Sequence, residues 1–365
     1  MPPPESRAEP QMTGVFNRIM VLYPRGLNTG GPEALHQLVD ELRRQGQDAT
    51  LVPLRETAAI ARVAAFAEYD APETDQIDDS PGNAVIAPEG VLDRLRDVRR
   101  AQRVCWWLSI DSSAPFFPRQ ETKDRRFTDA LGVRHVGWSP NIASAAYRRI
   151  AAHRPRRALL DSALHLTQSA YARAYLQTHL GISGTMVTDY IPRGVIDVVA
   201  RKPLAERGHT VAFNPKKASW APSLIGASLP GIQWRPLVGL DRRGVAELLA
   251  DTTAYFDPGY HPGRDRMPRE AALLGGVTLL ARRGAGAYWE DSPIPWEHKV
   301  SPGSGFLEGA RRALTAVVED PGAAAFAQTE YREWIDLDRV RFSREVGRSF
   351  VRGRWEDDSP ADHDG

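Results

Sequence analysis

One stretch of the chain, residues 253–286, restricts the fold more than any other part of the sequence. It begins with an apolar and aromatic run around Tyr255 that predicts a strand, and this run stops at residues 257–259, Asp-Pro-Gly. A loop crowded with charge follows. Pro268 and Glu270 then predict a helix, because proline suits the first helical turn and an acidic side chain is favoured at the positive end of the helix dipole.

The same stretch continues into a second strand and a glycine-rich loop. We expect the helix to run from Glu270 to Leu274, before two glycines, and residues 277–280 to form the next buried strand. The following loop contains Arg282, Arg283, Gly284 and Gly286. Ligands bind at the carboxyl ends of the strands in parallel α/β sheets. These loops therefore predict a site for an anionic ligand, and a nucleotide diphosphate fits it best.

The beginning of the chain has a similar pattern. Residues 17–24 predict a strand, and a loop with Gly30 and Gly31 follows it. A helix is expected from Pro32 to Arg44, since its apolar residues are spaced by three and four, and residues 48–54 predict the next strand. This is a βαβ unit, in which the two glycines allow the backbone to turn or to approach a ligand closely.

The length of 365 residues suits two domains better than one. A second series of strands and helices begins at residues 209–218, where a strand runs into a loop with Lys216 and Lys217. We therefore predict an α/β protein with a disordered tail over 1–13, a first domain over 14–198, a second domain over 199–337, a helix over 338–352 that packs across the domain junction, and a disordered acidic tail over 353–365.

The composition excludes several classes of protein. The chain has 47 Lys and Arg against 46 Asp and Glu, so we expect no nucleic-acid partner. Its single cysteine, Cys105, lies in an apolar run and is expected to be buried and unreactive. The sequence shows neither a secretory signal nor a run of the roughly 20 apolar residues that span a bilayer. A cytoplasmic protein is expected, and peripheral contact with the inner face of the cell membrane stays open.

Polar residues also follow a central strand of the first half. The strand at 103–113 is apolar on both faces until Ser109 and Asp111 appear at its carboxyl end. Asp111 is a candidate for catalysis or sugar contact, or else caps the following segment. Five arginines between residues 148 and 157 suggest a solvated helix face, with an anionic acceptor or a membrane surface as the alternative.

Several helices are predicted outside these units. An alanine-rich segment after Arg55 suggests a helix followed by a loop up to Gly82, and a basic helix is expected to end at Arg100. Three further helices are expected over about 305–318, 321–333 and 336–351. The last carries an apolar stripe, Phe342, Val346 and Phe350, with a spacing of four residues.

Several of these segments together resemble the glycosyltransferases of the GT-B fold, and most closely the retaining family-four enzymes. The resemblance covers roughly residues 17–351. It is carried by the Gly-Gly loop, by LTQSAYARAYL, TDYIPRGV and NPKKA, and most specifically by PREAALLGGVTLLARRGAG. It implies two Rossmann-like domains with parallel sheets that face a central cleft, an acceptor domain first and a nucleotide-sugar donor domain second.

The resemblance also implies roles for particular residues. Glu270 would hold the ribose hydroxyls of a nucleotide-sugar donor, and Lys216 or Lys217 would neutralise the diphosphate. Further donor contacts are expected from Gly30, Gly31, Arg269, Arg282, Gly284 and Gly286. The activity implied is transfer of a sugar, with retention, to a hydroxyl of a glycan, a lipid-linked acceptor or a small molecule. Because the departing diphosphate can itself take up the proton, no base, cofactor or metal is required.

The sequence departs from the family in two places. Position 262, where the family carries a second glutamate, is Pro262, and the neighbouring His261 is a candidate to take over its contact. The central strand ends in Ser109 and Asp111 where the family usually has a histidine. Each candidate also has an ordinary structural explanation: Glu270 as a helix-start residue, the lysines as a solvated turn, and Arg269 in an ion pair.

Two other functions stay open from the sequence. A nucleotide-sugar epimerase shares this fold and would turn over without an acceptor. A catalytically inactive nucleotide-sugar binding or scaffold protein would explain the missing glutamate at position 262. A dinucleotide oxidoreductase is disfavoured, because the loop after the first strand lacks the GxGxxG pattern. No histidine or cysteine cluster has the spacing of a metal site, so no metal is expected.

Overall fold

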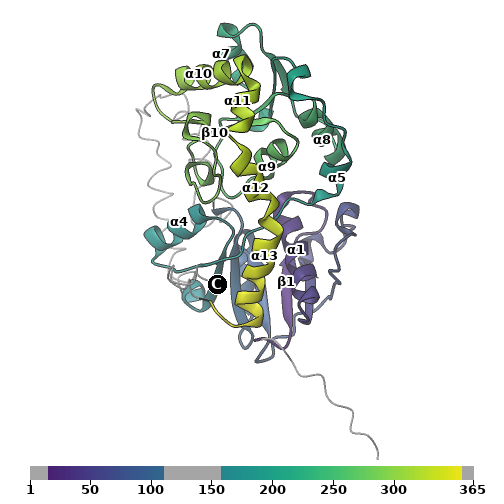
Figure 1. Ribbon diagram of the computed structural model, residues 1–365. Helices are drawn as coiled ribbons and strands as arrows, with labels where there is room; N and C mark the ends of the chain where they lie inside the picture. Colours follow the sequence, from purple (N-terminus) through teal and green to yellow (C-terminus); the bar gives the residue numbers. More distant parts are fainter. Residues whose placement is uncertain (1–14, 111–157, 356–365) are drawn as a thin grey trace, which may run out of the picture.

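Two separate parallel sheets form the framework of the molecule, one in each of its two lobes (Figure 1). The structure is a computed structural model that describes residues 15–110 and 158–355. The first sheet has the strand order β2-β1-β3-β4-β5-β6, and every neighbouring pair in it is parallel. Its strands are β1 (Ile19–Tyr23), β2 (Ala49–Pro53), β3 (Ala84–Pro88), β4 (Gln102–Trp107), β5 (Ala163–Thr167) and β6 (Thr185–Met186).

The second sheet has the order β11-β10-β9-β7-β8 and is also parallel throughout. Its strands are β7 (Thr210–Phe213), β8 (Gln233–Pro236), β9 (Ala254–Asp257), β10 (Val277–Ala281) and β11 (Lys299–Val300). The strands predicted around residues 17–24, 48–54, 209–218 and 277–280 are all present. The α/β prediction with two parallel sheets is therefore confirmed.

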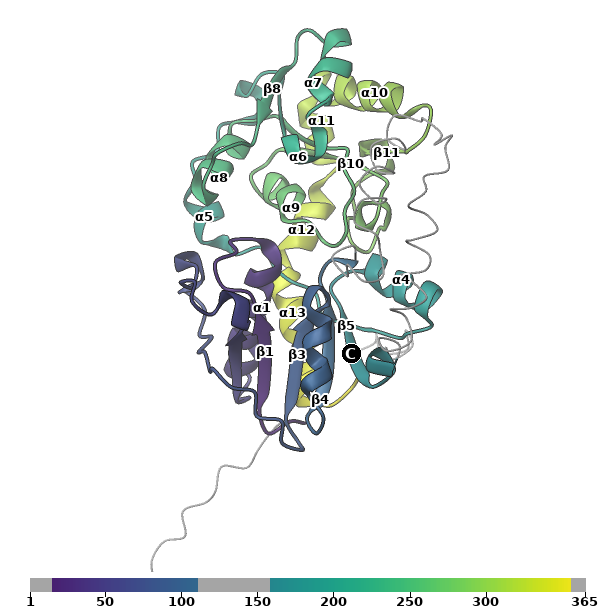
Figure 2. The ribbon, with the colours of Figure 1, turned by 180° about the vertical axis from the view of Figure 1, so that it is seen from behind.

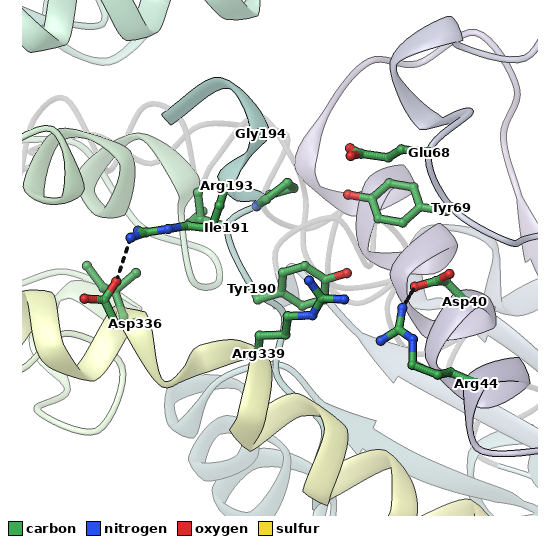
Figure 3. Close-up of a pocket in the computed structure, with 12 residues that line it drawn as sticks. Asp40, Arg44, Glu68, Tyr69, Tyr190, Ile191, Arg193, Gly194, Asp336 and Arg339 are labelled. Atoms are coloured by element: carbon green, nitrogen blue, oxygen red, sulfur yellow. Dashed lines mark hydrogen bonds and ion pairs between the residues drawn. The ribbon is translucent and has the colours of Figure 1, made fainter. Parts of the chain in front are cut away.

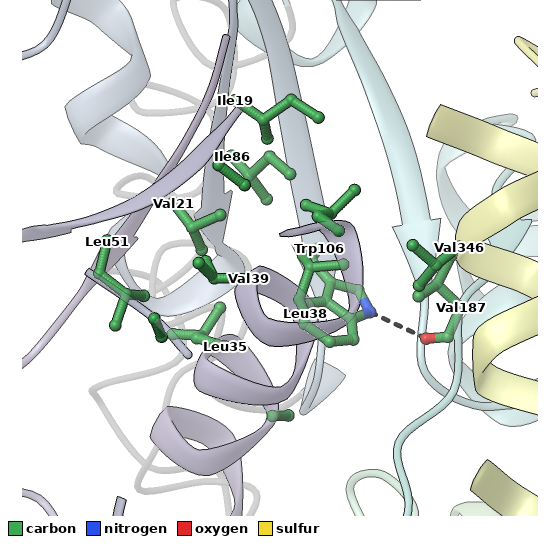
Figure 4. Packing of buried hydrophobic residues seen from close by; sticks show 14 of the residues in the cluster. Ile19, Val21, Leu35, Leu38, Val39, Leu51, Ile86, Trp106, Val187 and Val346 are labelled. Atoms are coloured by element: carbon green, nitrogen blue, oxygen red, sulfur yellow. Dashed lines mark hydrogen bonds between the residues drawn. The ribbon is translucent and has the colours of Figure 1, made fainter. Parts of the chain in front are cut away.

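The strands of the first sheet are buried on both faces. Successive residues of β1 illustrate this, since Ile19 and Val21 pack on one side of the sheet and Met20 and Leu22 on the other. Figure 4 shows the first of these cores, in which the indole nitrogen of Trp106 donates a hydrogen bond of 3.0 Å to the carbonyl oxygen of Val187. Covering both faces with helices is the usual arrangement of a parallel sheet.

The helices of the first domain follow the predicted pattern only in part. The helix α1 (Gly30–Arg44) begins at the two glycines, and α4 (Ala170–Leu180) is capped by the Ser169 hydroxyl and ends at Gly181 with φ 63°. The helix expected after residue 55 is wrong: that segment forms only the short 3-10 turns η1 (Arg55–Thr57) and η2 (Ala64–Phe66). The basic helix is the 3-10 segment η3 (Glu89–Asp97), kinked at Val91.

The second domain is covered by a larger number of short helices. They are α5 (Arg193–Val198), η5 (Leu204–Glu206), α6 (Pro215–Ala218), α7 (Ala221–Leu224), η6 (Gly226–Ser228), α8 (Arg242–Ala250), α9 (Arg266–Leu273), η7 (Ala285–Ala287), η8 (Trp296–His298), α10 (Phe306–Glu319), α11 (Pro321–Phe326) and α12 (Thr329–Asp336). The single helix expected over 321–333 is divided between α11 and α12, where the buried Gln328 side chain hydrogen-bonds the backbone of Thr278. Among the described residues, no helix is both long and apolar enough to cross a bilayer.

The chain crosses between the domains twice. Tyr190 belongs to the first-domain core and Ile191 to the second-domain core, so the first crossing lies between them. The predicted boundary at residue 198 comes later than this, because α5 packs in the second domain through Ile196. The chain returns through α13 (Asp338–Val346) and η9 (Gly347–Val351), which Figure 1 shows running down the first lobe. Their apolar stripe, Phe342, Val346 and Phe350, is buried in the first-domain core.

A buried cluster of ion pairs connects the two segments in which the chain crosses between the domains, and we refer to it as the joint. It consists of Arg264 and Arg269 from the second domain, Asp189 from the first crossing and Asp338 from the second. The guanidinium of Arg269 lies 2.8 Å from the Asp189 carboxylate and 3.2 Å from that of Asp338, and Arg264 lies 2.6 Å from Asp338. All four side chains are almost completely buried. The joint therefore fixes how the domains meet.

Candidate functional site

The carboxyl ends of both sheets border one cavity between the domains. Its volume is about 710 Å³. From the first domain it is lined by the turn before α1, the end of β3 and the end of β4, and from the second by Asn214, Lys217, Asp257 and residues 262–267. Figure 2 shows the two lobes from the other side, with β1, β3, β4 and β5 side by side in the first lobe. We call this cavity the cleft.

Two helices begin at the cleft, one from each domain. Gly30 and Gly31 at the start of α1 line it, and so do Arg266 and Met267 at the start of α9. A Cβ atom on Gly30 would lie 3.0 Å from the Arg266 side chain, so the missing side chain lets the two domains approach. The first backbone N–H groups of a helix and its dipole both favour anions. This part of the cleft therefore suits a phosphate group.

The second-domain side of the cleft is a compact group of paired charges. The Lys217 ammonium lies 3.1 Å from the Asp257 carboxylate and also bonds to Asp265. Burial acts to lower the pKa of Lys217, but the two carboxylates outweigh burial and hold that pKa above its ordinary value. Lys216, its neighbour in α6, makes no ion pair with a described residue and is exposed. Of the two lysines predicted to meet the diphosphate, only Lys217 lines the cleft.

His261 is the third side chain that contacts these two carboxylates. Its Nδ1 atom lies 2.9 Å from Asp265, and its Nε2 atom lies 3.8 Å from Asp257. Asp257, His261 and Asp265 offer ligand atoms within 4.8 Å of one another, a geometry that suits a metal ion. The Lys217 ammonium already supplies positive charge to both carboxylates, and with His261 it holds the pKa of Asp265 below its usual range although burial alone would raise that pKa. Transfer without a metal therefore stays our prediction.

Glu270 lies in α9 and does not itself line the cleft, but it bonds to Arg266, which does. Its carboxylate accepts a hydrogen bond of 2.8 Å from Arg266, which lines the cleft and also bonds to Glu33 of the first domain. Glu33 in turn receives a hydrogen bond of 3.0 Å from Arg242 at the start of α8. A chain of alternating charges thus links the two domains beside the cleft, and Glu270 is its last member.

The first-domain side of the cleft carries much less charge. Glu89, which follows β3, is 4% exposed, and its two carboxylate oxygens accept backbone hydrogen bonds of 2.8 Å from Leu108 and 2.9 Å from Ser109. Burial raises the pKa of Glu89 to about 7, and these two hydrogen bonds counteract only part of that effect. Asp111, which we predicted as a catalytic residue at this edge, lies outside the described residues, as do the arginines between 148 and 157.

The position of the missing glutamate is occupied by a contact between the domains. The carbonyl oxygen of Pro262 accepts a hydrogen bond of 3.1 Å from the backbone of Ile110. At the next position, a Cβ atom on Gly263 would lie only 2.2 Å from the carbonyl oxygen of Leu108. Backbone-to-backbone contact at this point requires glycine, and Leu108, Pro262 and Gly263 all line the cleft.

Four predicted donor contacts lie away from the cleft lining. Arg269 is 1% exposed and belongs to the joint, where its partners hold its pKa above the ordinary value although burial acts in the opposite direction. The Arg282 guanidinium packs over Trp296, with its central carbon 4.8 Å from the centre of the Trp296 ring. Gly284 and Gly286 give space to the His261 loop, since Cβ atoms there would lie 2.0 Å from the His261 carbonyl oxygen and 2.8 Å from its ring. All four have a local structural reason for their identity.

A second cavity lies where the chain crosses between the domains (Figure 3). Its volume is about 490 Å³, and its wall includes Tyr69, Tyr190 and Arg339, with the Arg339 guanidinium 5.5 Å from the centre of the Tyr190 ring. Two ion pairs border it, Arg44 with Asp40 and Arg193 with Asp336. It is formed by the crossing segments together with α1 and residues 68–69, and not by the carboxyl ends of strands.

Sequence analysis overlooked several residues of the cleft. Glu89 directly follows β3 and Asp257 is the last residue of β9, which was a usable signal for a residue at the carboxyl edge of a sheet. Glu33 carries no such signal, because it meets Arg266 only when the two domains pack together.

Comparison with known proteins identifies the fold. No protein-family model matches the chain, and no curated protein has a significantly similar sequence. Similar solved structures include sucrose-phosphate synthase from Thermosynechococcus elongatus, with 11% identity, a TM-score of 0.59 and coverage of 91% of this chain and 98% of that chain. Another is Anabaena HepE in complex with UDP-glucose, with 13% identity, a TM-score of 0.59 and the same coverage.

A glycosyltransferase from Rickettsia africae also aligns over 91% of this chain and 98% of its own, with 10% identity and a TM-score of 0.51. These alignments extend through both domains and the cleft between them. At this level of identity the similarity is one of architecture, and the chain has the GT-B fold found in these glycosyltransferases.

Proposed function

We propose that the protein transfers a sugar from a nucleotide-diphosphate sugar to a hydroxyl group of an acceptor. One observation carries the proposal: a cleft bordered by the carboxyl ends of two parallel sheets, with two helix N-termini and Lys217 at its wall. Such a wall suits the diphosphate, on which negative charge increases as the sugar leaves. HepE, of similar fold, was crystallised with UDP-glucose, which supports this class of donor.

In this proposal each domain has its own part. Lys217 and the start of α9 bind the diphosphate, and the start of α1 approaches it from the first domain. Glu270 binds the ribose hydroxyls, as the resemblance implies. Arg266 now bonds to one oxygen of the Glu270 carboxylate, so binding of two ribose hydroxyls by both oxygens would require the Arg266 side chain to turn away from it. Retention of configuration belongs to the proposal on the resemblance alone, and the anomeric coupling constant of the product would test it.

The first test is calorimetric titration of the purified protein with UDP, GDP, ADP and dTDP. We expect one of them to bind with a Kd near the micromolar range, about −8 kcal/mol. Glu270→Gln should weaken that binding about tenfold or more, because an amide is a poorer acceptor for two vicinal hydroxyls. Glu330→Gln, on the exposed side of α12, is the matched control and should bind like the wild type. If no nucleotide binds, the proposal is wrong.

One observation favours a second candidate, a nucleotide-sugar binding protein without transfer activity. The position of the missing glutamate, Pro262, serves a backbone contact between the domains and offers no carboxylate to a sugar. Binding of a nucleotide sugar without release of its diphosphate, over a broad panel of glycan and small-molecule acceptors, would favour this candidate. An epimerase would instead convert the donor sugar with no acceptor present.

A further inference from the structure

One oxygen of the Glu270 carboxylate is already bound by a residue of the same helix. Its Oε1 atom accepts a hydrogen bond of 2.8 Å from the Arg266 guanidinium, one turn earlier in α9. The other oxygen, Oε2, makes no hydrogen bond or ion pair with a described residue. The Glu270 side chain is 11% exposed, and Oε2 is not one of the polar atoms that are buried without a partner. Glu270 therefore offers one free oxygen to a ligand.

Arg266 is held in this position by the first domain. Its guanidinium also bonds to Glu33, whose side chain is 2% exposed. Glu33 in turn accepts hydrogen bonds of 3.0 Å from Arg242 and from the Tyr69 hydroxyl. The stem of Arg266 is packed as well, since a Cβ atom on Gly30 would lie 3.0 Å from its Cδ atom. Turning this guanidinium away would therefore disturb a contact between the domains.

The two groups that could bind Oε1 of Glu270 differ in charge. The guanidinium of Arg266 brings a full positive charge to a carboxylate that is largely removed from water, whereas a ribose hydroxyl brings only a dipole. Exchange of the guanidinium for a hydroxyl thus gives up an ion pair where solvent screens it little. The arrangement favours a nucleotide that needs one oxygen of Glu270 over one that needs both.

The number of hydroxyl groups on the nucleotide sugar ring follows from this arrangement. A ribose presents two vicinal hydroxyls, at C2′ and C3′, which fit best with one carboxylate oxygen each. A 2′-deoxyribose presents only the 3′-hydroxyl, which Oε2 of Glu270 can accept. A 2′-hydroxyl would leave water without gaining a carboxylate oxygen in return. The ring that matches the half-occupied carboxylate is therefore a 2′-deoxyribose.

We propose that the donor is a 2′-deoxyribonucleoside diphosphate sugar, and that Arg266 sets this preference by holding one oxygen of Glu270. This inference rests on the proposed function and names the class of donor for the same cleft. The preference concerns the ring that carries the base, and it applies to any base. Arg266 acts here through Glu270, as a residue that determines specificity.

Calorimetry with pairs of nucleoside diphosphates that differ only in the 2′-hydroxyl tests the preference. The pairs are UDP and dUDP, ADP and dADP, GDP and dGDP, and ribothymidine diphosphate and dTDP. For the base that binds, we expect the wild type to bind the 2′-deoxy compound more tightly than its ribose counterpart or within about threefold of it. Arg266→Met frees Oε1 of Glu270 and should shift this ratio about tenfold towards the ribose compound.

The chain offers a matched control in Arg242. Arg242→Met also removes a guanidinium from Glu33, but Arg242 makes no bond to Glu270, so this variant should keep the wild-type ratio. Each ratio compares two ligands on one protein. A general loss of diphosphate binding in a variant therefore cancels.

The two proposals fail in different ways. If none of these diphosphates binds to the wild type, the donor site and the proposed function are wrong. If the wild type binds a ribose compound more than about threefold tighter than its 2′-deoxy counterpart, the donor site stands and the deoxyribose preference is overturned. A shift of less than about threefold in Arg266→Met would overturn the role of Arg266. The wild-type ratio decides the preference even if that variant does not fold.

Discussion

The joint and the cleft share one helix, α9, and are built from the same types of residue, yet their charges are arranged differently. Arg269 points into the joint, where two arginines and two aspartates are buried and matched. Arg266, three positions earlier, lies at the cleft between Glu33 and Glu270 and is partly exposed. In the cleft the matching is incomplete, because Glu89 has no cation among the described residues.

This difference separates charges that hold the molecule together from charges that are available to a ligand. A buried, fully matched ion pair is costly to break from one side. A buried carboxylate without a partner titrates near neutral pH, and Arg266 leaves one oxygen of Glu270 to a ligand. The predictions below test this separation, beginning with the largest effect.

Removing one charge from the joint should destabilise the protein strongly. Arg269→Met leaves Asp189 without its closest partner and should lower the free energy of unfolding by about 3–5 kcal/mol, measured by urea denaturation. Arg266→Met on the same helix is the control and should cost less, because Arg266 is 20% exposed and Glu33 keeps Arg242 as a partner. Equal losses in the two variants would contradict the separation of joint and cleft.

The unmatched carboxylate in the cleft should make stability depend on pH. Since burial raises the pKa of Glu89 from 4.5 to about 7, the folded state holds this proton more tightly than the unfolded state. The contribution of Glu89 is therefore greatest at low pH and is lost as the pH rises from about 5 to about 7.

This loss can be isolated with a variant. The difference in free energy of unfolding between the wild type and Glu89→Gln should fall by about 2–3 kcal/mol between pH 5 and pH 8. Denaturant titrations at several pH values would measure it. A difference that stays constant with pH would show that Glu89 is ionised throughout this range.

The two neighbouring lysines should differ in donor binding. Lys217→Met should weaken binding of the nucleoside diphosphate at least tenfold, about 1.4 kcal/mol, because Lys217 lines the cleft. Lys216→Met removes an equal charge one position away and should change the affinity by less than about twofold, since Lys216 is outside the cleft lining. Calorimetry of the two variants measures both values, and equal effects would place the diphosphate elsewhere.

Metal removal should have the smallest effect. The Lys217 ammonium already bonds to the two carboxylates of the Asp257, His261 and Asp265 group. Dialysis against EDTA should therefore leave diphosphate release from the donor sugar unchanged, and added Mn²⁺ or Mg²⁺ should not raise it. A loss of activity that Mn²⁺ restores would assign this group to a metal instead.

Local sequence patterns predicted most of the strands and the loops that border the cleft. Apolar runs followed by glycine, proline or charge are local signals, and they correctly placed β1, β7, β9 and β10. The loop predicted at Gly30 and Gly31 is instead the beginning of α1, two residues before the predicted start at Pro32. The start of α9 was predicted at Pro268, but the helix begins at Arg266, which brings this arginine into the first turn beside the cleft.

What the sequence did not reveal are partners that lie far apart in the chain. Arg269 has the same local context as a donor-binding residue of the family, but its partners Asp189 and Asp338 are 80 and 69 positions away. Only the packing of both crossings against α9 brings these charges together. For the same reason, the position of Glu89 after a strand was visible, whereas its lack of a cation was not.

The return of the chain to the first domain has a consequence for protein synthesis. Phe342, Val346 and Phe350 fill part of the first-domain core, although about 150 residues of the second domain separate them from the rest of that core. While the chain is being made, this part of the first-domain core therefore stays open until the ribosome has released the residues up to Phe350. Its exposed apolar surface during that interval is where chaperones would bind and where truncated chains would aggregate.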